Sequence, residues 1–175
     1  DHLYAAPVLV RYFREKALDD LVVVAPDVGS AKMARGYARR LKAGFAIIDK
    51  RRPAPNVAEV VNVVGEVDGK TCLLVDDMVD TGGTLVNAVH ALLERGAKAV
   101  YAAASHPLLS GPAVERLSQA PLEELVVTNT IDVPEERRFE KLRILSVAGL
   151  LANAIQYIHS NESVSALFEV PDEET

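Results

Sequence analysis

The segment LLVDDMVDTGGT, residues 73–84, decides the fold class of this 175-residue chain. Its first residues are apolar, as in a strand that is buried on both faces, and they lead directly into two carboxylates, Asp76 and Asp77. The run TGGT, residues 81–84, then opens a helical pattern that stops near Gly96. A buried strand that passes through a glycine-containing loop into a helix is the repeating unit of α/β folds.

Short β-branched runs alternate with longer helical patterns on both sides of this segment. Apolar runs that predict strands lie at residues 21–26, 45–49, 71–77, 99–105, 124–130 and 144–147. Helices are predicted after the first, third and last of these runs, and another at the beginning of the chain. We therefore expect an α/β fold, in which a single domain over residues 1–175 contains a mainly parallel five- or six-stranded sheet with helices on both faces.

The composition limits the kinds of partner. The chain is 49% hydrophobic and 25% charged, which is ordinary for a globular protein, and its net charge is -6. A nucleic-acid-binding domain would have a basic face, so we expect no nucleic-acid partner. No apolar run approaches the roughly 20 residues that span a bilayer, and the one cysteine, Cys72, cannot form an intrachain disulfide. These features predict a soluble, cytoplasmic protein with no membrane partner.

Residues 76–84 give the strongest chemical signal. Glycines let backbone N–H groups approach a phosphate closely, hydroxyls add donors, and a helix N-terminus favours negative charge. Asp76 and Asp77 cannot bind phosphate, but carboxylates suit sugar hydroxyls, directly or through a hard cation that prefers oxygen ligands. The alternative is an acidic turn followed by an ordinary helix cap. The full order of strand, acidic pair and TGGT favours a sugar-phosphate site.

The segment PDVGS, residues 26–30, follows another predicted strand. Asp27 is expected to project over the sheet, while Gly29 and Ser30 open a helix whose N–H groups can face phosphate oxygens. Because ligands bind beyond the carboxyl ends of parallel strands, we expect Asp27 to lie near Asp76 and its neighbour. The alternative is that this segment is only a helix cap.

The segment KRRPAPN, residues 50–56, breaks both the strand and the helix periodicity. It combines three cations with two prolines. It is either a mobile catalytic lid, whose cations stabilise phosphoryl charge, or a solvated basic loop.

Residues 73–84 resemble the ribose-phosphate binding loop shared by type I phosphoribosyltransferases and ribose-phosphate pyrophosphokinases. Other segments distinguish the two families, because they resemble the pyrophosphokinases in the same order along the chain. These segments are APDVGSAKMARGYARRL, IIDKRRPAPNVAEVVNVVGEV, SHPLLSGPAVERL, VVTNTI and ESVSALF. The likeness covers nearly the whole chain and is close to the bacterial enzymes. It matches the C-terminal one of their two similar domains plus a short lead-in.

The resemblance implies a type I phosphoribosyltransferase-like domain and an enzyme activity. In this family a pyrophosphoryl group passes from ATP to the anomeric hydroxyl of ribose 5-phosphate, with Mg²⁺ as cofactor. Lys50 and Arg52 match the catalytic lysine and arginine of a flexible loop at about residues 50–60. The ribose 5-phosphate site is matched by Asp76, Asp77, Asp80, Thr81, Gly82, Gly83 and Thr84.

Two further sites are implied in part. Asp27, Gly29 and Ser30 match the pyrophosphate-side loop of the family, with Asp27 as a Mg²⁺ ligand. The other metal ligand of the family is a histidine of the N-terminal domain, to which neither His2 nor His106 corresponds, so we expect an incomplete metal site. A phosphate and ADP regulatory site between subunits is matched by Ser163, Ser165 and Phe168.

Because the resemblance covers the C-terminal domain alone, we expect this half to bind ribose 5-phosphate but to make little or no product by itself. We also expect homo-oligomers that form through the interfaces of the family. Two alternatives stay open. A type I phosphoribosyltransferase would need a hood segment to hold its base, and the chain has no spare stretch for one. A non-catalytic regulatory module would depart from the enzymes in the catalytic loop, whereas residues 50–56 contain no insertion.

Overall fold

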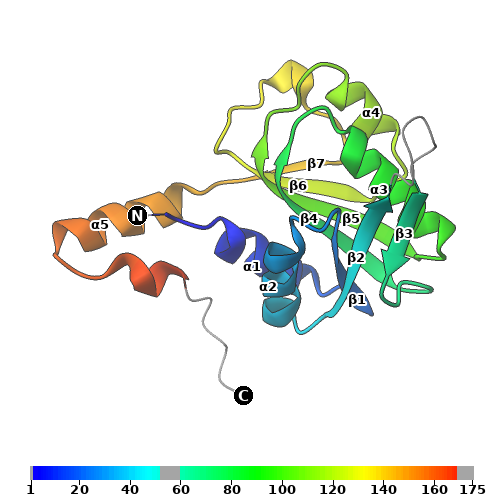
Figure 1. Cartoon of the computed structure of the whole chain (residues 1–175). Helices are drawn as coiled ribbons and strands as arrows, with labels where there is room; N and C mark the ends of the chain where they lie inside the picture. The colour runs from blue at the N-terminus through cyan, green and yellow to red at the C-terminus, as the bar shows by residue number, and fades with distance from the viewer. Residues whose placement is uncertain (1, 52–59, 169–175) are drawn as a thin grey trace.

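The computed structural model describes residues 2–51 and 60–168, with the backbone alone at residues 50, 51, 60, 61, 166 and 168. Within this part, one sheet has the strand order β3-β2-β1-β4-β5-β6-β7 (Figure 1). The strands are β1 (Leu21–Ala25), β2 (Gly44–Arg51), β3 (Val60–Val64), β4 (Thr71–Val79), β5 (Ala99–Pro107), β6 (Glu124–Thr128) and β7 (Leu142–Leu145). The helices are α1 (Ala6–Lys16), α2 (Ala31–Leu41), α3 (Gly83–Glu94), α4 (Ala113–Gln119) and α5 (Ala148–His159), with short 3₁₀ turns η1 (Glu135–Arg137) and η2 (Val164–Phe168).

The pairing of the strands confirms the predicted α/β class. Neighbouring strands are parallel throughout the described sheet except for β2 and β3, which are antiparallel. The described sheet has seven strands, one more than the upper number expected. The additional strand is β3, an edge strand whose only neighbour in the described sheet is β2. The sequence analysis missed it, although its sequence, VVNVV, is rich in the β-branched residues that favour strands.

Strand β2 continues further than the sequence pattern predicts. Lys50 pairs with Val61 and Arg51 with Val60 at the end of the antiparallel ladder. The backbone of Lys50 and Arg51 therefore belongs to a strand and not to the loop that was expected to begin at residue 50. The remainder of that expected loop, residues 52–59 with Arg52, lies outside the described residues.

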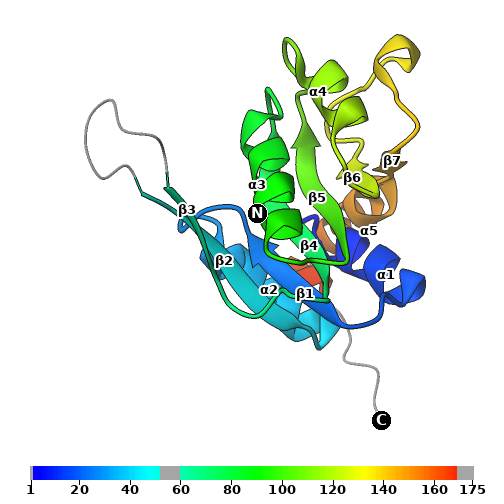
Figure 2. The same cartoon turned by 90° about the vertical axis from the view of Figure 1, so that its right-hand side faces the viewer.

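The central strands bury both of their faces, as their continuous apolar runs predict. Alternate residues of β1 and β4 face two different cores, because side chains alternate across a strand. One core joins Val22, Val24, Cys72 and Leu74 to residues of α3 and α4 such as Leu85, Val89, Leu92 and Leu117. The other joins Val23, Leu73 and Val75 to residues of α1 and α2 such as Leu9, Phe13 and Tyr37. Figure 2 shows α3 and α1 on opposite sides of the sheet.

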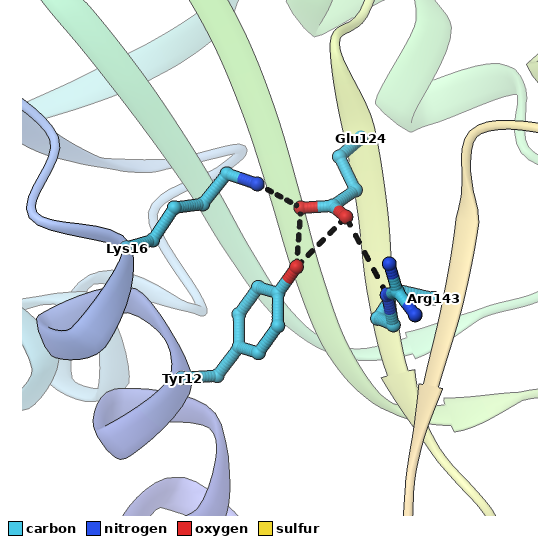
Figure 3. Close-up of polar contacts among 4 residues, drawn as sticks. All are labelled: Tyr12, Lys16, Glu124 and Arg143. Carbon is cyan, nitrogen blue, oxygen red and sulfur yellow. Dashed lines mark hydrogen bonds and ion pairs between the residues drawn. The ribbon is translucent and has the colours of Figure 1, made fainter.

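Helix α1 is joined to the distant half of the sheet by a polar cluster around Glu124, the first residue of β6 (Figure 3). The Tyr12 hydroxyl lies 2.8 Å from Oε1 and 2.9 Å from Oε2 of Glu124. Lys16 Nζ is 3.0 Å from Oε2, and Arg143 Nε of β7 is 3.8 Å from Oε1. Burial alone would lower the pKa of Lys16, but the hydrogen bond and the charge of Glu124 outweigh it and raise that pKa. The beginning of the chain is therefore an integral part of this domain.

Candidate functional site

The carboxyl ends of β1 and β4 bring three carboxylates to the same edge of the sheet. The two strands are parallel neighbours, with Val24 opposite Leu74. Asp27 follows β1 by two residues, and Asp76 and Asp77 lie in the last half of β4. Asp27 is close enough for its charge to act on Asp76. The expectation that these three residues cluster is confirmed.

Among the described carboxyl groups, Asp76 has the pKa that the fold shifts most. Its pKa rises to about 6 from an ordinary 3.8, chiefly because the carboxyl is partly buried. The charges of Asp77 and Asp27 raise the pKa further. The Asp77 N–H, which donates to Asp76 Oδ1 at 2.9 Å, lowers it. Ionising Asp76 in this place costs free energy chiefly because burial removes water from the carboxylate, and the charges of Asp77 and Asp27 add to that cost. A bound cation or a ring of sugar hydroxyls would reduce that cost.

The same carboxylates are the oxygen donors that Mg²⁺ prefers. Within the described residues, however, no group of three or more His, Cys, Asp or Glu side chains is placed to hold a metal ion. The fit is therefore partial: Asp27 and Asp76 can supply some ligands, and substrate oxygens and water would have to supply the others, as is usual for Mg²⁺.

The loop after β4 presents backbone N–H groups at the start of α3. Gly82 is the N-cap of this helix, with a left-handed backbone (φ 74°), and a Cβ there would lie 3.1 Å from Leu117 Cγ of α4. Only glycine fits both demands without strain. The first N–H groups of α3 have no acceptor inside the helix, and the glycine N-cap has no side chain to cap them. They are available to an anion.

Residues that are distant in sequence donate hydrogen bonds to the carbonyl oxygens of this loop. The Leu109 N–H donates to the Val79 carbonyl at 3.0 Å and the Ser110 N–H to the Asp80 carbonyl at 2.9 Å. Arg116 Nη1 donates to the Thr81 carbonyl at 3.2 Å. With its carbonyl oxygens bonded in this way, the loop can present its donors outward.

Arg116 is a site residue that the sequence analysis missed. Its guanidinium would lie 3.6 Å from a Cβ built on Gly83, so it places a positive charge beside the loop. It lies on α4, outside the TGGT motif and 35 residues from Thr81, and no local pattern could have indicated it. The side chains of Asp80, Thr81 and Thr84 are exposed at this loop.

The segment that contains Asp27 has a different geometry. Asp27 Oδ1 accepts the Ser30 N–H at 2.9 Å and lies 3.1 Å from Ser30 Oγ. Ser30 Oγ is also 3.1 Å from the Asp27 carbonyl oxygen. One oxygen of Asp27 is thus used on the N–H of Ser30, the N-cap residue of α2, and no side-chain hydrogen bond caps the first turn of that helix. Gly29 is exposed between them.

The remaining predicted site residues are described only in part, and Arg52 lies outside the described residues. The backbone of Lys50 is at the carboxyl end of β2, on the same edge of the sheet as Asp27, because β2 is parallel to β1. Ser163 and Ser165 are exposed, 3.0 Å apart between their hydroxyl oxygens, and belong to the segment that packs on α5, away from the sheet (Figure 1). Phe168 is the last residue of η2.

A hollow of about 710 Å³ lies elsewhere, at the amino ends of β1 and β2. Its lining includes Phe13, Leu18, Leu21, Lys42 and Phe45. None of the predicted site residues lines it. Since ligands of parallel sheets bind at the carboxyl ends, the loops around Asp76 are the better candidate site.

Comparison with known proteins agrees with this geometry. The profile of the phosphoribosyl synthetase-associated domain family matches residues 50–169. Ribose-phosphate pyrophosphokinase of Bacillus subtilis is 56% identical over 168 residues, which are 96% of this chain and 53% of that protein. Ribose-phosphate pyrophosphokinase 1 of Listeria monocytogenes is 58% identical over 170 residues, 97% of this chain and 54% of that protein. The chain thus spans about half the length of these relatives.

Solved structures show the same likeness. The crystal structure of phosphoribosylpyrophosphate synthetase from Mycobacterium smegmatis superposes with a TM-score of 0.86 at 45% identity, covering 92% of this chain and 52% of that one. The APRTase from Giardia lamblia, solved with 9-deazaadenine, has a TM-score of 0.57 at 18% identity, covering 81% and 77%, and shares the fold alone. Among the described residues, no helix has the length and apolar character needed to cross a membrane.

Proposed function

This chain belongs to the phosphoribosyl synthetase-associated domain family, that of the ribose-phosphate pyrophosphokinases, and on this premise we propose that it binds ribose 5-phosphate beside Mg²⁺. The observation that supports this most is the β4–α3 connection. There, a helix start with no side-chain cap directly follows a strand that carries a pair of carboxylates. A phosphate and a polyol separated by a short distance are the two ends of a sugar phosphate.

In this proposal the 5-phosphate lies at the start of α3. Backbone N–H groups at Gly83 and Thr84 and the hydroxyls of Thr81 and Thr84 donate to its oxygens, and the helix N-terminus favours its negative charge. Arg116 adds a positive charge from the adjacent helix. The Asp80 carboxylate points away from the dianion, and its residue contributes backbone to the loop.

The sugar hydroxyls lie beside Asp76 and Asp77. Carboxylates accept hydrogen bonds from hydroxyls. The charges of Asp77 and Asp27, which add to the effect of burial on the pKa of Asp76, also attract a divalent cation. Asp27 and Asp76 would supply oxygen ligands to Mg²⁺, which when bound would neutralise the charge of a transferred pyrophosphoryl group. The Gly29–Ser30 backbone, at the start of α2, faces that group.

For the complete protein we propose the activity of the named relatives, with this chain as its C-terminal half. The anomeric hydroxyl of ribose 5-phosphate would attack the β-phosphorus of ATP with its oxygen and release its proton to water. The bond between that phosphorus and the α–β bridging oxygen would break, and AMP would leave with that oxygen. Lys50 and Arg52 would stabilise the charge that develops on the phosphates. Holding both substrates in position contributes much of the rate acceleration in such a reaction. We therefore expect these 175 residues to bind ribose 5-phosphate without converting it to product.

Titration calorimetry with ribose 5-phosphate, in the presence of Mg²⁺, tests the binding site. A Gly83→Val variant should lose affinity by at least about tenfold, because the side chain would stand among the N–H donors. Its fold should persist, since the nearest atom to a Cβ at Gly83 is 3.6 Å away. Gly149→Val is the matched control: Gly149 is also in the first turn of a helix and has no atom within 4 Å of its Cβ position. Equal affinity of Gly83→Val and the control would refute the assignment.

A further inference from the structure

The turn that supports the β4–α3 loop has an unusual backbone at Leu109, two residues after β5. The Leu109 N–H donates to the Val79 carbonyl, at the start of that loop, at 3.0 Å. The backbone of Leu109 is left-handed (φ 51°), a conformation that residues with a Cβ rarely adopt. Such a conformation persists only where the surrounding structure stabilises it. The contacts that stabilise Leu109 therefore also fix its hydrogen bond to the loop.

The carbonyl of Leu109 is bonded by a residue from a distant element. Arg137, the last residue of η1, donates a hydrogen bond from Nη2 to this carbonyl oxygen across 28 positions of sequence. Leu109 is only 1% exposed, so water has almost no access to the carbonyl. Among the described residues, no other group donates to this oxygen. Removal of the guanidinium would leave a buried acceptor without a partner, which is unfavourable.

The connection between β6 and β7, residues 129–141, is anchored to the core on both sides of η1. Val133 is buried in the core that covers the α3 side of the sheet, and Phe139 packs against the same core. Leu109 is also a member of that core. Figure 1 and Figure 2 both show η1, in yellow, at the same end of the sheet as α4. Arg137 thus reaches Leu109 from a segment that is itself fixed by packing.

The neighbouring residue, Arg138, has the same chemistry but a local partner. Its Nε donates to the Val133 carbonyl at 3.0 Å, five positions away in the same connection. Of these two adjacent arginines, only Arg137 donates to the turn that supports the β4–α3 loop in the described part of the chain. The pair therefore separates a contact with that turn from a contact within the β6–β7 connection.

We propose that Arg137 is a positioning residue for the ribose 5-phosphate site, because it fixes the Leu109 turn and this turn fixes the start of the β4–α3 loop. Two hydrogen bonds form the route, from Arg137 to the Leu109 carbonyl and from the Leu109 N–H to the Val79 carbonyl. The Ser110 N–H, which donates to the Asp80 carbonyl at 2.9 Å, belongs to the same turn. The expected effect on affinity rests on the proposed function, whereas the effect on the turn does not.

Hydrogen exchange of the free chain, resolved by residue with NMR, tests the support without a ligand. The Leu109 and Ser110 amides are bonded to loop carbonyls, so their exchange reports this contact directly. Arg137→Met removes the donors, and both amides should exchange at least about fivefold faster relative to the Leu73 amide, which reports global unfolding. Arg138→Met is the matched control and should match the wild type. Equal exchange in the two variants overturns the proposal.

Titration calorimetry of the same variants with ribose 5-phosphate and Mg²⁺ tests the consequence for binding. Arg137→Met should lower the affinity at least about fivefold, as for the loss of one net hydrogen bond, while Arg138→Met should leave it unchanged. Arg137→Lys keeps a donor and should retain most of the affinity. Equal losses in both methionine variants, or a lysine variant as weak as Arg137→Met, would overturn the proposal. If the wild type binds no ribose 5-phosphate, the proposed function fails, and the exchange rates still decide whether Arg137 fixes the turn.

Discussion

Two loops of this protein connect a strand to a helix at the same edge of the sheet, and their own groups are hydrogen-bonded in different ways. In the β1–α2 loop, Asp27 accepts the Ser30 N–H, so the N–H of the N-cap residue of α2 is bonded by a side chain of the same loop. In the β4–α3 loop, the N-cap is Gly82 and has no side chain. There the contacts come from Leu109, Ser110 and Arg116, which bind carbonyl groups of the loop.

This difference indicates which of the two loops is better suited to bind an anion. A loop whose own aspartate accepts one of its N–H groups has already used part of its hydrogen-bonding capacity. A loop whose carbonyl oxygens are bonded by distant residues is fixed in shape while its N–H groups stay available. The second arrangement makes the β4–α3 loop the stronger anion site, and it makes that loop depend on tertiary contacts. Four predictions test this contrast.

The largest difference in stability between the two loops is expected when Gly82 and Gly29 are each replaced by alanine. Gly82→Ala should destabilise the fold by about 2–4 kcal/mol, because the left-handed backbone disfavours a Cβ and Leu117 lies in its way. Gly29→Ala should cost less than about 1 kcal/mol, since the neighbour in its way, Asp27 Oδ1 at 3.2 Å, is on a side chain that can shift. Urea unfolding measures both. Similar losses at the two positions would contradict the contrast.

A pH-dependent effect is expected at Asp76. Its pKa is about 6 in the fold and 3.8 ordinarily, so the folded state binds the proton more tightly than the unfolded state. The stability that this contributes is present below about pH 4 and is lost as the pH rises through about 6. Asp76→Asn cannot ionise and should therefore be about 1–2 kcal/mol more stable than the wild type at pH 8 in metal-free buffer, allowing for solvent screening.

The gain at Asp76→Asn should be smaller at pH 4, where the wild-type carboxyl is largely protonated. Thermal unfolding at both pH values measures it. Asp77→Asn is the control, because Asp77 is exposed. Removing the charge of Asp77 should stabilise the fold less than Asp76→Asn does, since it removes only the repulsion between Asp77 and Asp76. A stability difference between wild type and Asp76→Asn that does not change with pH would contradict the burial of the charge.

Hydroxyl removal in the two loops should affect different properties. Ser30→Ala should lower the free energy of unfolding by about 0.5–1 kcal/mol, because buried Ser30 shares hydrogen bonds with Asp27. Thr81→Ala, at an exposed residue, should leave that free energy nearly unchanged and weaken ribose 5-phosphate binding. Unfolding and calorimetry on the same samples separate the two. The reverse pattern would mean that the β1–α2 loop is the principal anion site.

The smallest effect is expected at Arg116. Arg116→Gln keeps a donor for the Thr81 carbonyl but removes the charge, so the affinity for ribose 5-phosphate should fall about threefold at low salt. The loss should shrink as salt is added, because the side chain is exposed. Calorimetry at two ionic strengths measures this. A loss that is independent of salt would indicate that Arg116 acts by shaping the loop and not by its charge.

Much of the fold could be predicted from the sequence, since its signals are local. The continuous apolar runs at β1 and β4 indicated strands buried on both faces, and the residues after them contained the site. The end of β2 could not be predicted from its own residues, because Lys50 and Arg51 are polar and become strand residues only by pairing with Val61 and Val60. No window of β2 alone contains that information. Strand β3 was missed although its sequence, VVNVV, is rich in the β-branched residues that favour strands.

By itself, the sequence determined the acidic pair, the TGGT run and their order along one strand–loop–helix unit, because hydrophobic periodicity and glycine chemistry act over a few residues. The tertiary structure alone decided that Asp76 would be partly buried with Asp27 nearby, which together raise the pKa of that carboxyl, and that Arg116 and Leu117 would contact the loop. It also decided that Leu151, Ile155 and Ile158 of α5 would remain exposed. The physical reason is that charge repulsion and close packing depend on distance in space, and the order of the strands in the sheet sets that distance.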